Sequence, residues 1–302
     1  MSRSKNNNIL VFGGTGLIGR PVVRQMVSHG HHVRIYTRKP VRAEALLPEQ
    51  CEIIKGDLTD RDALLDAMTD IDAIYTSLPN RMTMTRPAWD PDVEGVKNII
   101  AVAKEAGVQR LLKLSAMGVG EDRANWWVAD AKAQIEDVIR ESGLQYTIFR
   151  PTWFMESLPL FGLGPHMFVL PAPKKPLYWL AGEDYGKQVC AALRSREAIN
   201  QTYLCQGADP LSMKDACTTF AEQVGKRFVL TPIPQPAVWL GAKVAPPMHY
   251  LKHLLDMTYN HVVNIPKDVN GMDLYRPRIT VEQFAADLSQ TTDWPNKSLA
   301  IG

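Results

Sequence analysis

The residues with the clearest chemical meaning form a glycine-rich loop near the amino end. The loop reads Gly13-Gly14-Thr15-Gly16-Leu17-Ile18-Gly19. An apolar run at 9–12 precedes it and predicts a buried strand, and a helical pattern at 21–29 follows it. Gly13 permits a tight turn, Gly16 lets the backbone approach a pyrophosphate, and Gly19 lets the helix pack on the sheet. The start of the helix offers N–H groups and a partial positive charge to phosphates.

This pattern predicts dinucleotide binding by the loop. The alternative is a turn that only requires glycine. The expected contacts in the loop are Gly13, Thr15, Gly16, Leu17, Ile18 and Gly19.

The choice of cofactor depends on the end of the second expected strand, which reads Tyr36-Thr37-Arg38-Lys39. An acidic residue there would bind the 2′-hydroxyl of NAD and repel the 2′-phosphate of NADP. No acid is present; Arg38 can bind a phosphate with two N–H groups, and Lys39 adds a point charge. We therefore expect NADP(H), unless these side chains are ordinary solvated cations. Arg20, at the helix start, could reach the same site.

Two later segments are expected to complete the cofactor site. Asp57-Leu58 follows the third expected strand, where such folds commonly contact adenine, although Asp57 could equally cap the next helix. Ser77-Leu78-Pro79 ends the fourth expected strand and should pass near the ribose and pyrophosphate, mainly through its backbone.

These residues need a scaffold, and the sequence predicts one from alternating strands and helices. The expected strands are 9–12, 33–36, 51–54, 73–77, 110–115 and 146–150. The expected helices between them are 21–29, 61–68, 92–106 and 132–142. This alternation predicts an α/β fold with a doubly wound parallel sheet, the Rossmann fold, and helices on both faces.

The alternation ends after Pro151, which predicts a smaller C-terminal substrate-binding domain. We expect an NADP-binding domain at 1–155, to which 183–206 returns with a helix at 183–194 and a strand at 202–204. The smaller region is then 156–182 and 207–302. Within it, the Pro-, Gly- and aromatic-rich segment 159–176 predicts a loop over an apolar site, and 212–225 predicts a helix.

Composition narrows the class of protein. The 302 residues carry a formal net charge of +2, which disfavours binding to a nucleic-acid backbone. The four cysteines, Cys51, Cys190, Cys205 and Cys217, lack metal-ligand spacing and indicate a reducing compartment. No apolar stretch is long enough for a membrane span, so we expect a cytoplasmic protein. His249 and His253 have the spacing of a helical metal pair, but their apolar context argues against a metal.

The sequence resembles the short-chain dehydrogenase/reductase superfamily, and more closely its atypical NmrA-like group. The resemblance covers most of the chain, beginning with residues 9–19. Its most group-specific stretch is Thr147-Ile148-Phe149-Arg150-Pro151-Thr152-Trp153-Phe154-Met155-Glu156. Further matches are Gly56-Asp57-Leu58, Glu94-Gly95-Val96-Lys97-Asn98, Leu114-Ser115-Ala116 and Gly182-Glu183-Asp184-Tyr185-Gly186.

The resemblance implies a catalytic Tyr-x-x-x-Lys pair with a supporting Ser. Ser115 matches the Ser and Lys132 the Lys, but Val128 stands where the Tyr is expected and cannot donate a proton. Lys132 would then bind the nicotinamide ribose, and Ser115 would contact cofactor or substrate. The alternatives are a surface lysine, which could pair with Glu136, and a turn serine.

Aromatic residues are the candidates for a substrate pocket. The expected pocket residues are Trp126, Trp127, Trp153, Phe154 and His166, with Phe161, Phe168 and Trp179 as further candidates for its wall. Flat rings suit a flat substrate, and His166 is a possible proton donor. The alternative is that several of these rings belong to the core.

Two functions of different class are compatible with these features. The first is an NADPH-dependent reductase of a small planar or conjugated substrate, such as a quinone, enone or imine, which needs less help from a protein acid. The second is a regulator that senses NADP(H) and acts on a protein partner. The missing Tyr favours the regulator, whereas Lys132 and the aromatic loop favour the reductase. An epimerase or dehydratase is a more distant third, because those enzymes usually keep the Tyr.

Overall fold

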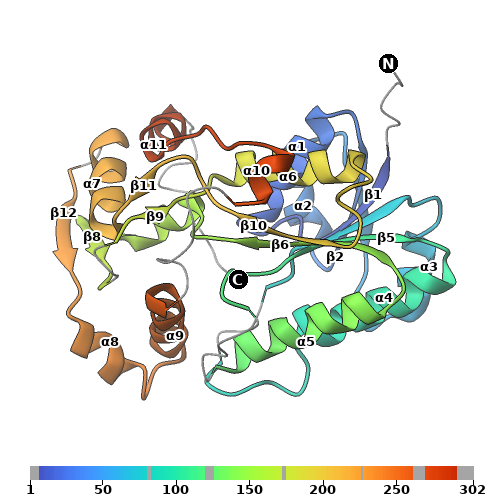
Figure 1. Ribbon diagram of the computed structural model, residues 1–302, viewed down its shortest axis with the longest axis horizontal. Coiled ribbons are helices and arrows are strands. Elements are labelled where there is room, and N and C mark those ends of the chain that lie inside the picture. The colour runs from blue at the N-terminus through green and yellow to red at the C-terminus, as the bar shows by residue number, and fades with distance from the viewer. Residues whose placement is uncertain are drawn as a thin grey trace.

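A seven-stranded parallel sheet forms the centre of the larger part of the molecule (Figure 1). The computed structural model describes residues 7–79, 83–119, 126–171, 175–225, 227–260 and 269–290. The strands are β1 (Asn8–Phe12), β2 (His32–Thr37), β3 (Glu52–Lys55), β4 (Ala73–Thr76), β5 (Arg110–Leu114), β6 (Gln145–Pro151) and β10 (Gln201–Cys205). Their order in the sheet is β10-β6-β5-β4-β1-β2-β3, and each neighbouring pair is parallel. The doubly wound parallel sheet expected from the sequence is confirmed.

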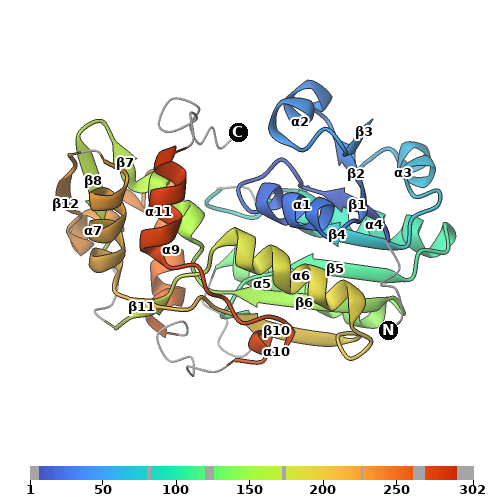
Figure 2. The same cartoon turned by 90° about the horizontal axis from the view of Figure 1, so that it is seen from above.

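Helices cover both faces of this sheet (Figures 1 and 2). One face carries α1 (Gly19–Ser28), α2 (Pro40–Leu46) and α6 (Gly182–Arg194). The other carries α3 (Arg61–Ala67), the π-helical turn η1 (Pro91–Gly95) with α4 (Val96–Glu105), and α5 (Trp127–Glu141). Strand β1 shows why: Ile9 and Val11 pack in the first layer, while Leu10 and Phe12 pack in the second. An uninterrupted apolar strand is what burial on both faces requires.

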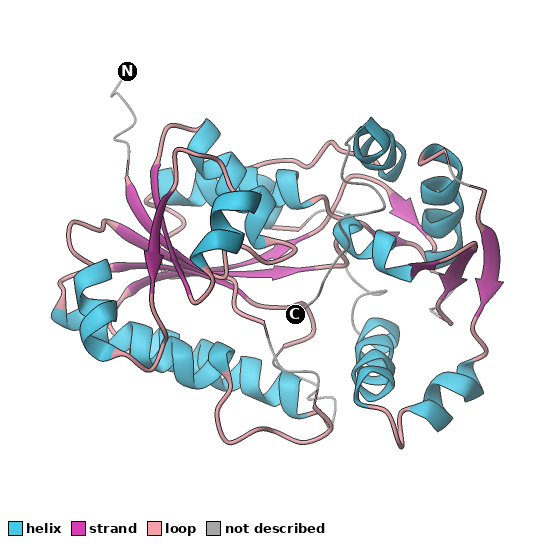
Figure 3. Ribbon diagram, turned by 180° about the vertical axis from the view of Figure 1, so that it is seen from behind, coloured by secondary structure: helices cyan, strands magenta, loops and turns pink. Residues whose placement is uncertain are grey.

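The smaller part lies beyond the carboxyl ends of β5 and β6 (Figures 2 and 3). A three-stranded sheet in it has the order β12-β8-β7, and a two-stranded sheet joins β9 to β11. The strands are β7 (Gly162–Leu163), β8 (His166–Val169), β9 (Leu177–Tyr178), β11 (Pro210–Leu211) and β12 (Val229–Pro232). The helices are η2 (Met155–Phe161, a 3₁₀ helix), α7 (Met213–Gln223), α8 (Gln235–Gly241), α9 (Pro246–Asn260) and α11 (Val281–Gln290). The short helix α10 (Gly271–Leu274) packs instead against α6 and β10 of the larger part. A separate apolar core, which includes Trp179 and Phe220, holds this part together.

Several elements differ from their expected form. Segment 159–176, expected to be a loop, contains the antiparallel pair β7 and β8, which joins β12 in the small sheet. The helix expected at 132–142 begins at Trp127, and the one expected at 92–106 opens with the π-helical turn η1. Within the described residues, no helix is both long and apolar enough to cross a membrane.

Candidate functional site

The glycine loop is pressed against the end of β4. Gly13 has a φ of +84°, and a Cβ added there would lie 2.2 Å from the carbonyl oxygen of Ser77. A Cβ on Gly19 would lie 2.1 Å from the carbonyl oxygen of Gly13. Backbone N–H groups pin the turn: Gly16 donates to Gly13 O at 3.0 Å, and Ser77 donates to Phe12 O at 2.9 Å. Glycine is required at 13 and 19 because no side chain fits there.

The helix start that follows the loop is open to an anion. Helix α1 has no side-chain cap at Ile18 and no acidic residue in its first turn. Gly16 is exposed, and Thr15, Leu17 and Ile18 are half-buried. Uncapped N–H groups at a helix N-terminus bind phosphate well. The Nε of Arg20 donates to Gly16 O at 3.4 Å, which places its charge beside the loop.

The loops after β2 and β3 meet next to this turn. Arg38 and Lys39 are both exposed. The carboxylate of Asp57 accepts hydrogen bonds from the N–H (3.0 Å) and hydroxyl (2.7 Å) of Thr59. These bonds and the charge of Arg38 lower the pKa of Asp57. The cap of α3 is Asp60, not Asp57, so capping does not explain Asp57. The side chain of Leu58 is buried in the core, which leaves only its backbone for a ligand.

Strand order brings all these segments to one edge of the sheet. The loops after β3, β2, β1, β4 and β5 follow one another along the carboxyl edge, because the strands are parallel and adjacent in that order. Ser77, Leu78 and Pro79 follow β4, between the glycine loop and the residues after β5. Ligands of open α/β sheets bind along this edge.

A buried carboxylate with two lysines lies on the β5 side of this edge. Asp92, in η1, accepts a hydrogen bond from Lys113 Nζ at 2.6 Å and from Lys132 Nζ at 3.0 Å. The side chain of Asp92 is fully buried and that of Lys113 is 1% exposed, whereas that of Lys132 is 13% exposed. Lys132 is therefore fixed by an ion pair with a buried carboxylate and is only slightly exposed to solvent. It is not a free surface cation.

The opposite charges of this cluster shift the pKa values of its members. Burial would raise the pKa of Asp92, but the two ammonium groups hold it below its usual value. Burial opposes the charge on Lys132, yet Asp92 outweighs it and raises the pKa of Lys132. For Lys113 burial dominates and lowers the pKa. With one carboxylate facing two lysines, the cluster keeps positive charge at Lys132.

Ser115 takes part in a second buried network. Its hydroxyl donates to Glu136 Oε1 at 2.5 Å. Glu136 also accepts from Arg140 at 2.6 Å and from Arg150 at 2.5 Å. Burial would raise the pKa of Glu136, but the bonds from Arg150, Ser115 and Arg140 hold it low. A pairing of Glu136 with Lys132 was therefore the wrong alternative: the two residues serve separate networks.

A small cavity of about 40 Å³ adjoins Lys132. Its wall includes Ala116, Val128, Trp126 and Tyr250. Tyr250 comes from α9, which lies beside the amino end of α5 (Figure 1). The rings of Trp126 and Tyr250 pack edge-on, with 5.0 Å between their centroids. Trp126 also stacks on the ring of His253, with 5.7 Å between the centroids. The buried indole N–H of Trp126 has no hydrogen-bond partner among the described residues.

Of the expected pocket residues, only Trp126 lies at this cavity. The indole of Trp127 donates to Thr83 O, and that of Trp153 donates to Thr258 inside the smaller core. Phe154 packs edge-on against Tyr185 at 5.4 Å, in the core of the large sheet. His166 is exposed on β8, and its contacts in the described structure are Thr231 and Phe168. These five residues therefore lie in separate parts of the structure and do not line one pocket.

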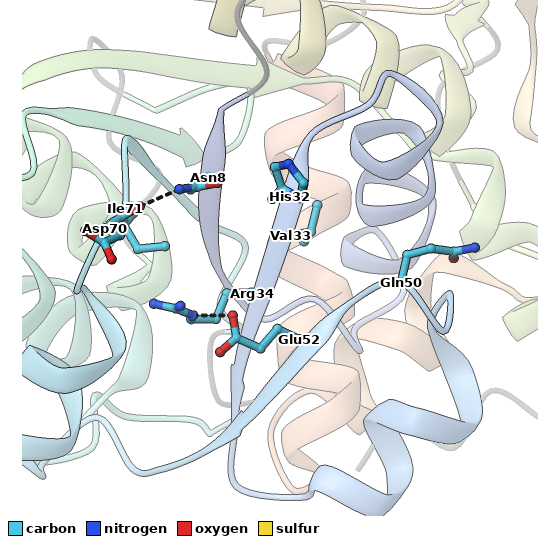
Figure 4. A pocket seen from close by; sticks show the side chains of 8 residues that line it. All are labelled: Asn8, His32, Val33, Arg34, Gln50, Glu52, Asp70 and Ile71. Carbon is cyan, nitrogen blue, oxygen red and sulfur yellow. Dashed lines mark hydrogen bonds and ion pairs between the residues drawn. The ribbon is translucent and has the colours of Figure 1, made fainter.

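A larger hollow of about 340 Å³ lies at the opposite edge of the sheet (Figure 4). It is lined by Asn8, Arg34, Glu52 and Asp70, among others, at the amino ends of the strands. Arg34 is already bound there, to Glu52 at 2.7 Å and to two backbone carbonyls. Because α/β sheets bind ligands at the carboxyl ends, we assign no site to this hollow.

The histidines and cysteines add no metal chemistry to the described structure. His249 and His253 contact each other at 4.6 Å, and burial lowers the pKa of His253 to about 4. Among the described residues no group of three or more His, Cys, Asp or Glu side chains could hold a metal ion. The four cysteines are free, and three of them are buried.

A family model decides the class of this protein. The model of the NmrA-like family matches residues 5–285. The chain belongs to the NmrA-like family. This confirms the resemblance seen in the sequence.

Relatives of this NmrA-like protein carry different roles. A photosystem II assembly factor, Ycf39 of Cyanophora paradoxa, is 26% identical over 237 residues, 75% of this chain and 72% of that protein. A (4-alkanoyl-5-oxo-2,5-dihydrofuran-3-yl)methyl phosphate reductase of Streptomyces griseus is 27% identical over 245 residues, 80% of this chain and 83% of that protein.

Solved structures share its fold. The NADPH-dependent quinone oxidoreductase of Escherichia coli in complex with NADPH has a TM-score of 0.71 at 18% identity, over 93% of this chain and 99% of that chain. The triphenylmethane reductase of Citrobacter sp. with NADP(H) has a TM-score of 0.69 at 16% identity, over 93% and 99% of the two chains.

Three residues of this NmrA-like site were not predicted from the sequence. Asp92 was only part of an expected helix, and Tyr250 lies in a segment where only the histidines stood out. Glu156 was noted only as part of a motif. Its Oε1 accepts from Gly182 N at 2.8 Å, and its Oε2 is buried with no hydrogen-bond partner in the described structure. Burial raises the pKa of Glu156 to about 7. It lies against the first turn of α1, since a Cβ on Gly182 would meet both Glu156 and Pro21 at 2.6 Å.

Proposed function

We propose that this protein is an NADPH-dependent reductase of a small planar or conjugated acceptor, such as a quinone, an enone or an imine. The observation that carries the proposal is the buried Lys132–Asp92 pair beside a cavity at the carboxyl edge of the sheet. The same edge carries the uncapped glycine loop, so a cofactor bound along it would reach from Arg38 to Lys132.

The residues present fit NADP(H). The loop from Gly13 to Gly19 has the close backbone approach and the open helix start that a pyrophosphate needs. Arg38 is exposed at the end of β2, where a 2′-phosphate would lie, and no acid replaces it. When bound, the cofactor supplies a hydride. Lys132 would donate hydrogen bonds to the nicotinamide ribose and hold the ring in place.

Similar proteins support a reductase. The Streptomyces griseus relative is named a reductase, and the Escherichia coli and Citrobacter structures are reductases of a quinone and of triphenylmethane compounds, with NADPH or NADP(H) bound. A conjugated acceptor also fits Val128 at the position of the missing Tyr, because such acceptors need less help from a protein acid than a simple carbonyl does.

A second candidate function is a non-catalytic sensor of NADP(H) that acts on a protein partner. Two observations favour it. The cavity beside Lys132 holds about 40 Å³, whereas small-molecule sites commonly hold about 300–1,000 Å³. In addition, the relatives named Ycf39 are assembly factors. We rank it second because a sensor needs no buried lysine beside a cavity.

Two measurements on the purified protein separate these functions. NADPH and NADH binding are followed by the quenching of tryptophan fluorescence, and NADPH oxidation is followed by absorbance with a panel of quinones, enones, imines and aldehydes. A reductase binds NADPH more tightly than NADH and oxidises it only when an acceptor is added. Tight NADPH binding without turnover on any acceptor would instead support the sensor. Failure to bind either cofactor would contradict both candidate functions.

A further inference from the structure

We propose that the hydroxyl of Tyr250, on α9, is the proton donor of the reduction and takes the place of the tyrosine that α5 lacks. The proposal rests on the reductase function above. It names a residue on a different element, in the other part of the molecule.

Val128 marks the position on α5 where the tyrosine is missing. This side chain is 1% exposed and lies one helical turn before Lys132 on α5. Tyr250 packs against the cluster of Trp126, Val128 and Ala129, which contains the position of the missing tyrosine. Tyr250 and Lys132 line the same cavity. The smaller part of the molecule therefore brings a phenol to the cavity that the lysine lines.

The charges around Tyr250 suit a proton donor. Burial raises the pKa of Tyr250, the Lys132 ammonium opposes this, and Asp92 adds to it. At neutral pH the hydroxyl therefore carries its proton. Once the proton leaves, the Lys132 ammonium stabilises the phenolate. Trp126 fixes the ring from its edge at 5.0 Å, and His253 holds Trp126 from its face.

The reaction balances with an enone as acceptor. A hydride from the dihydronicotinamide forms a C–H bond at the β-carbon, the carbon–carbon π bond breaks, and its electron pair moves toward the carbonyl oxygen. The Tyr250 hydroxyl gives its proton to that oxygen, and the enol becomes the ketone in water. The cofactor is oxidised by two electrons, the enone is reduced, and the phenolate regains a proton from solvent.

A pair of acceptors separates proton donation from a structural role. An enone needs a hydride and a proton, whereas a cationic triphenylmethane dye needs only a hydride to become neutral. We expect Tyr250→Phe to lower kcat/KM for the enone at least 50-fold more than for the dye. Tyr259→Phe is the matched control, because this tyrosine of α9 is exposed and its hydroxyl donates to Pro171 O. Equal losses on both acceptors, or no loss on either, would overturn the proposal.

A measurement without cofactor tests the geometry itself. In protein labelled with ¹³Cζ-tyrosine, the Tyr250 resonance is the one missing from Tyr250→Phe. We expect this resonance to move in Lys132→Met, while that of Tyr259 stays in place. An unmoved Tyr250 resonance would show that the hydroxyl does not face Lys132. A wild-type protein that reduces neither acceptor would refute the reductase itself, and this outcome differs from active wild type with an unaffected Tyr250→Phe variant.

Discussion

Lys132 and Asp92 form an ion pair, with 3.0 Å between Nζ and Oδ2, in which the carboxylate is fully buried and the lysine is not. Lys113 Nζ binds the other oxygen of the same carboxylate, Oδ1, at 2.6 Å. Asp92 therefore remains paired when Lys132 is removed. This arrangement separates the role of Lys132 in the fold from its role at the cavity.

Lys132→Met is expected to lower kcat/KM for an acceptor about 100-fold, which corresponds to about 2.7 kcal/mol of transition-state stabilisation. The loss arises because no ammonium is left to orient the nicotinamide ribose. The fold should persist, since Asp92 keeps Lys113. Steady-state NADPH oxidation and circular dichroism are the measurements. Lys104→Met, the same change on the exposed face of α4, should behave as wild type. A fully active Lys132→Met variant would return Lys132 to an ordinary surface lysine.

Arg38→Glu is expected to weaken NADPH binding at least tenfold more than NADH binding, a difference of about 1.4 kcal/mol or more. The reversed charge would repel a 2′-phosphate that only NADPH carries. Fluorescence titration with each cofactor gives the ratio. Arg24→Glu is the control, because Arg24 is exposed on α1 and lies outside the expected site. If Arg38→Glu weakened both cofactors equally, Arg38 would have no part in choosing between them.

Gly13→Ala and Gly107→Ala form a pair that isolates the close approach of the loop to β4. Both glycines have positive φ, +84° and +77°, so each alanine carries a similar backbone strain of about 1 kcal/mol. At Gly107 nothing lies within 4 Å of the added Cβ, whereas at Gly13 the Ser77 carbonyl lies at 2.2 Å. We therefore expect Gly13→Ala to unfold at clearly lower urea concentration and to lose NADPH binding at least tenfold. Similar midpoints for the two variants would contradict this packing.

The pH dependence of stability should carry the signature of Glu156. Its pKa is about 7 in the folded protein and 4.5 in the unfolded chain. Between these values the folded protein keeps the proton and the unfolded chain loses it, so stability falls as pH rises, by about 3 kcal/mol in total. Glu156→Gln keeps an oxygen for Gly182 N–H but cannot ionise. Relative to wild type, this variant should gain about 2–3 kcal/mol more at pH 8 than at pH 5 in urea unfolding.

The matched control for Glu156 is Asp62→Asn, whose side chain is 94% exposed. This variant should change stability equally at both pH values. If Glu156→Gln also gave the same difference at pH 5 and pH 8, the carboxyl of Glu156 would titrate normally in the folded protein.

The sheet and the glycine loop could be predicted because their signals are local. Continuous apolar runs such as Ile9–Phe12 mark strands buried on both faces, and the glycines follow directly on the first of them. The carboxyl edge then follows from the parallel order alone. This is why Arg38, Asp57 and Ser77 lie along one edge, as expected.

The Lys132 cluster could not be predicted in this way. Asp92 meets Lys132 across 40 residues of chain, and only the packing of η1 against α5 brings them together. Glu136 looked like the natural partner of Lys132 at helical spacing, but Arg140 and Arg150 hold it on another side. Charge pairing inside a core depends on tertiary contacts that no local pattern records.

Helix α9, which carries Tyr250, was missed for a different reason. Prolines usually interrupt helices, but Pro246 stands at the first position of α9, and Pro236 lies in the first turn of α8. Proline is favoured at such positions, because its missing N–H would be unpaired there in any case. The aromatic residues were ambiguous for another reason. Trp126 and Trp153 each precede a second aromatic residue, and only the fold places Trp153 in the core and Trp126 at the cavity.

We propose that this protein transfers a hydride from NADPH to a conjugated acceptor. The most direct measurement uses NADPH deuterated at C4, separately on each face of the ring, with an enone that wild-type protein reduces. Mass spectrometry of the product then locates the label. We expect deuterium on the β-carbon from one face only, since Lys132 would hold the ring in one orientation. Product without deuterium from either cofactor, or equal label from both, would contradict it.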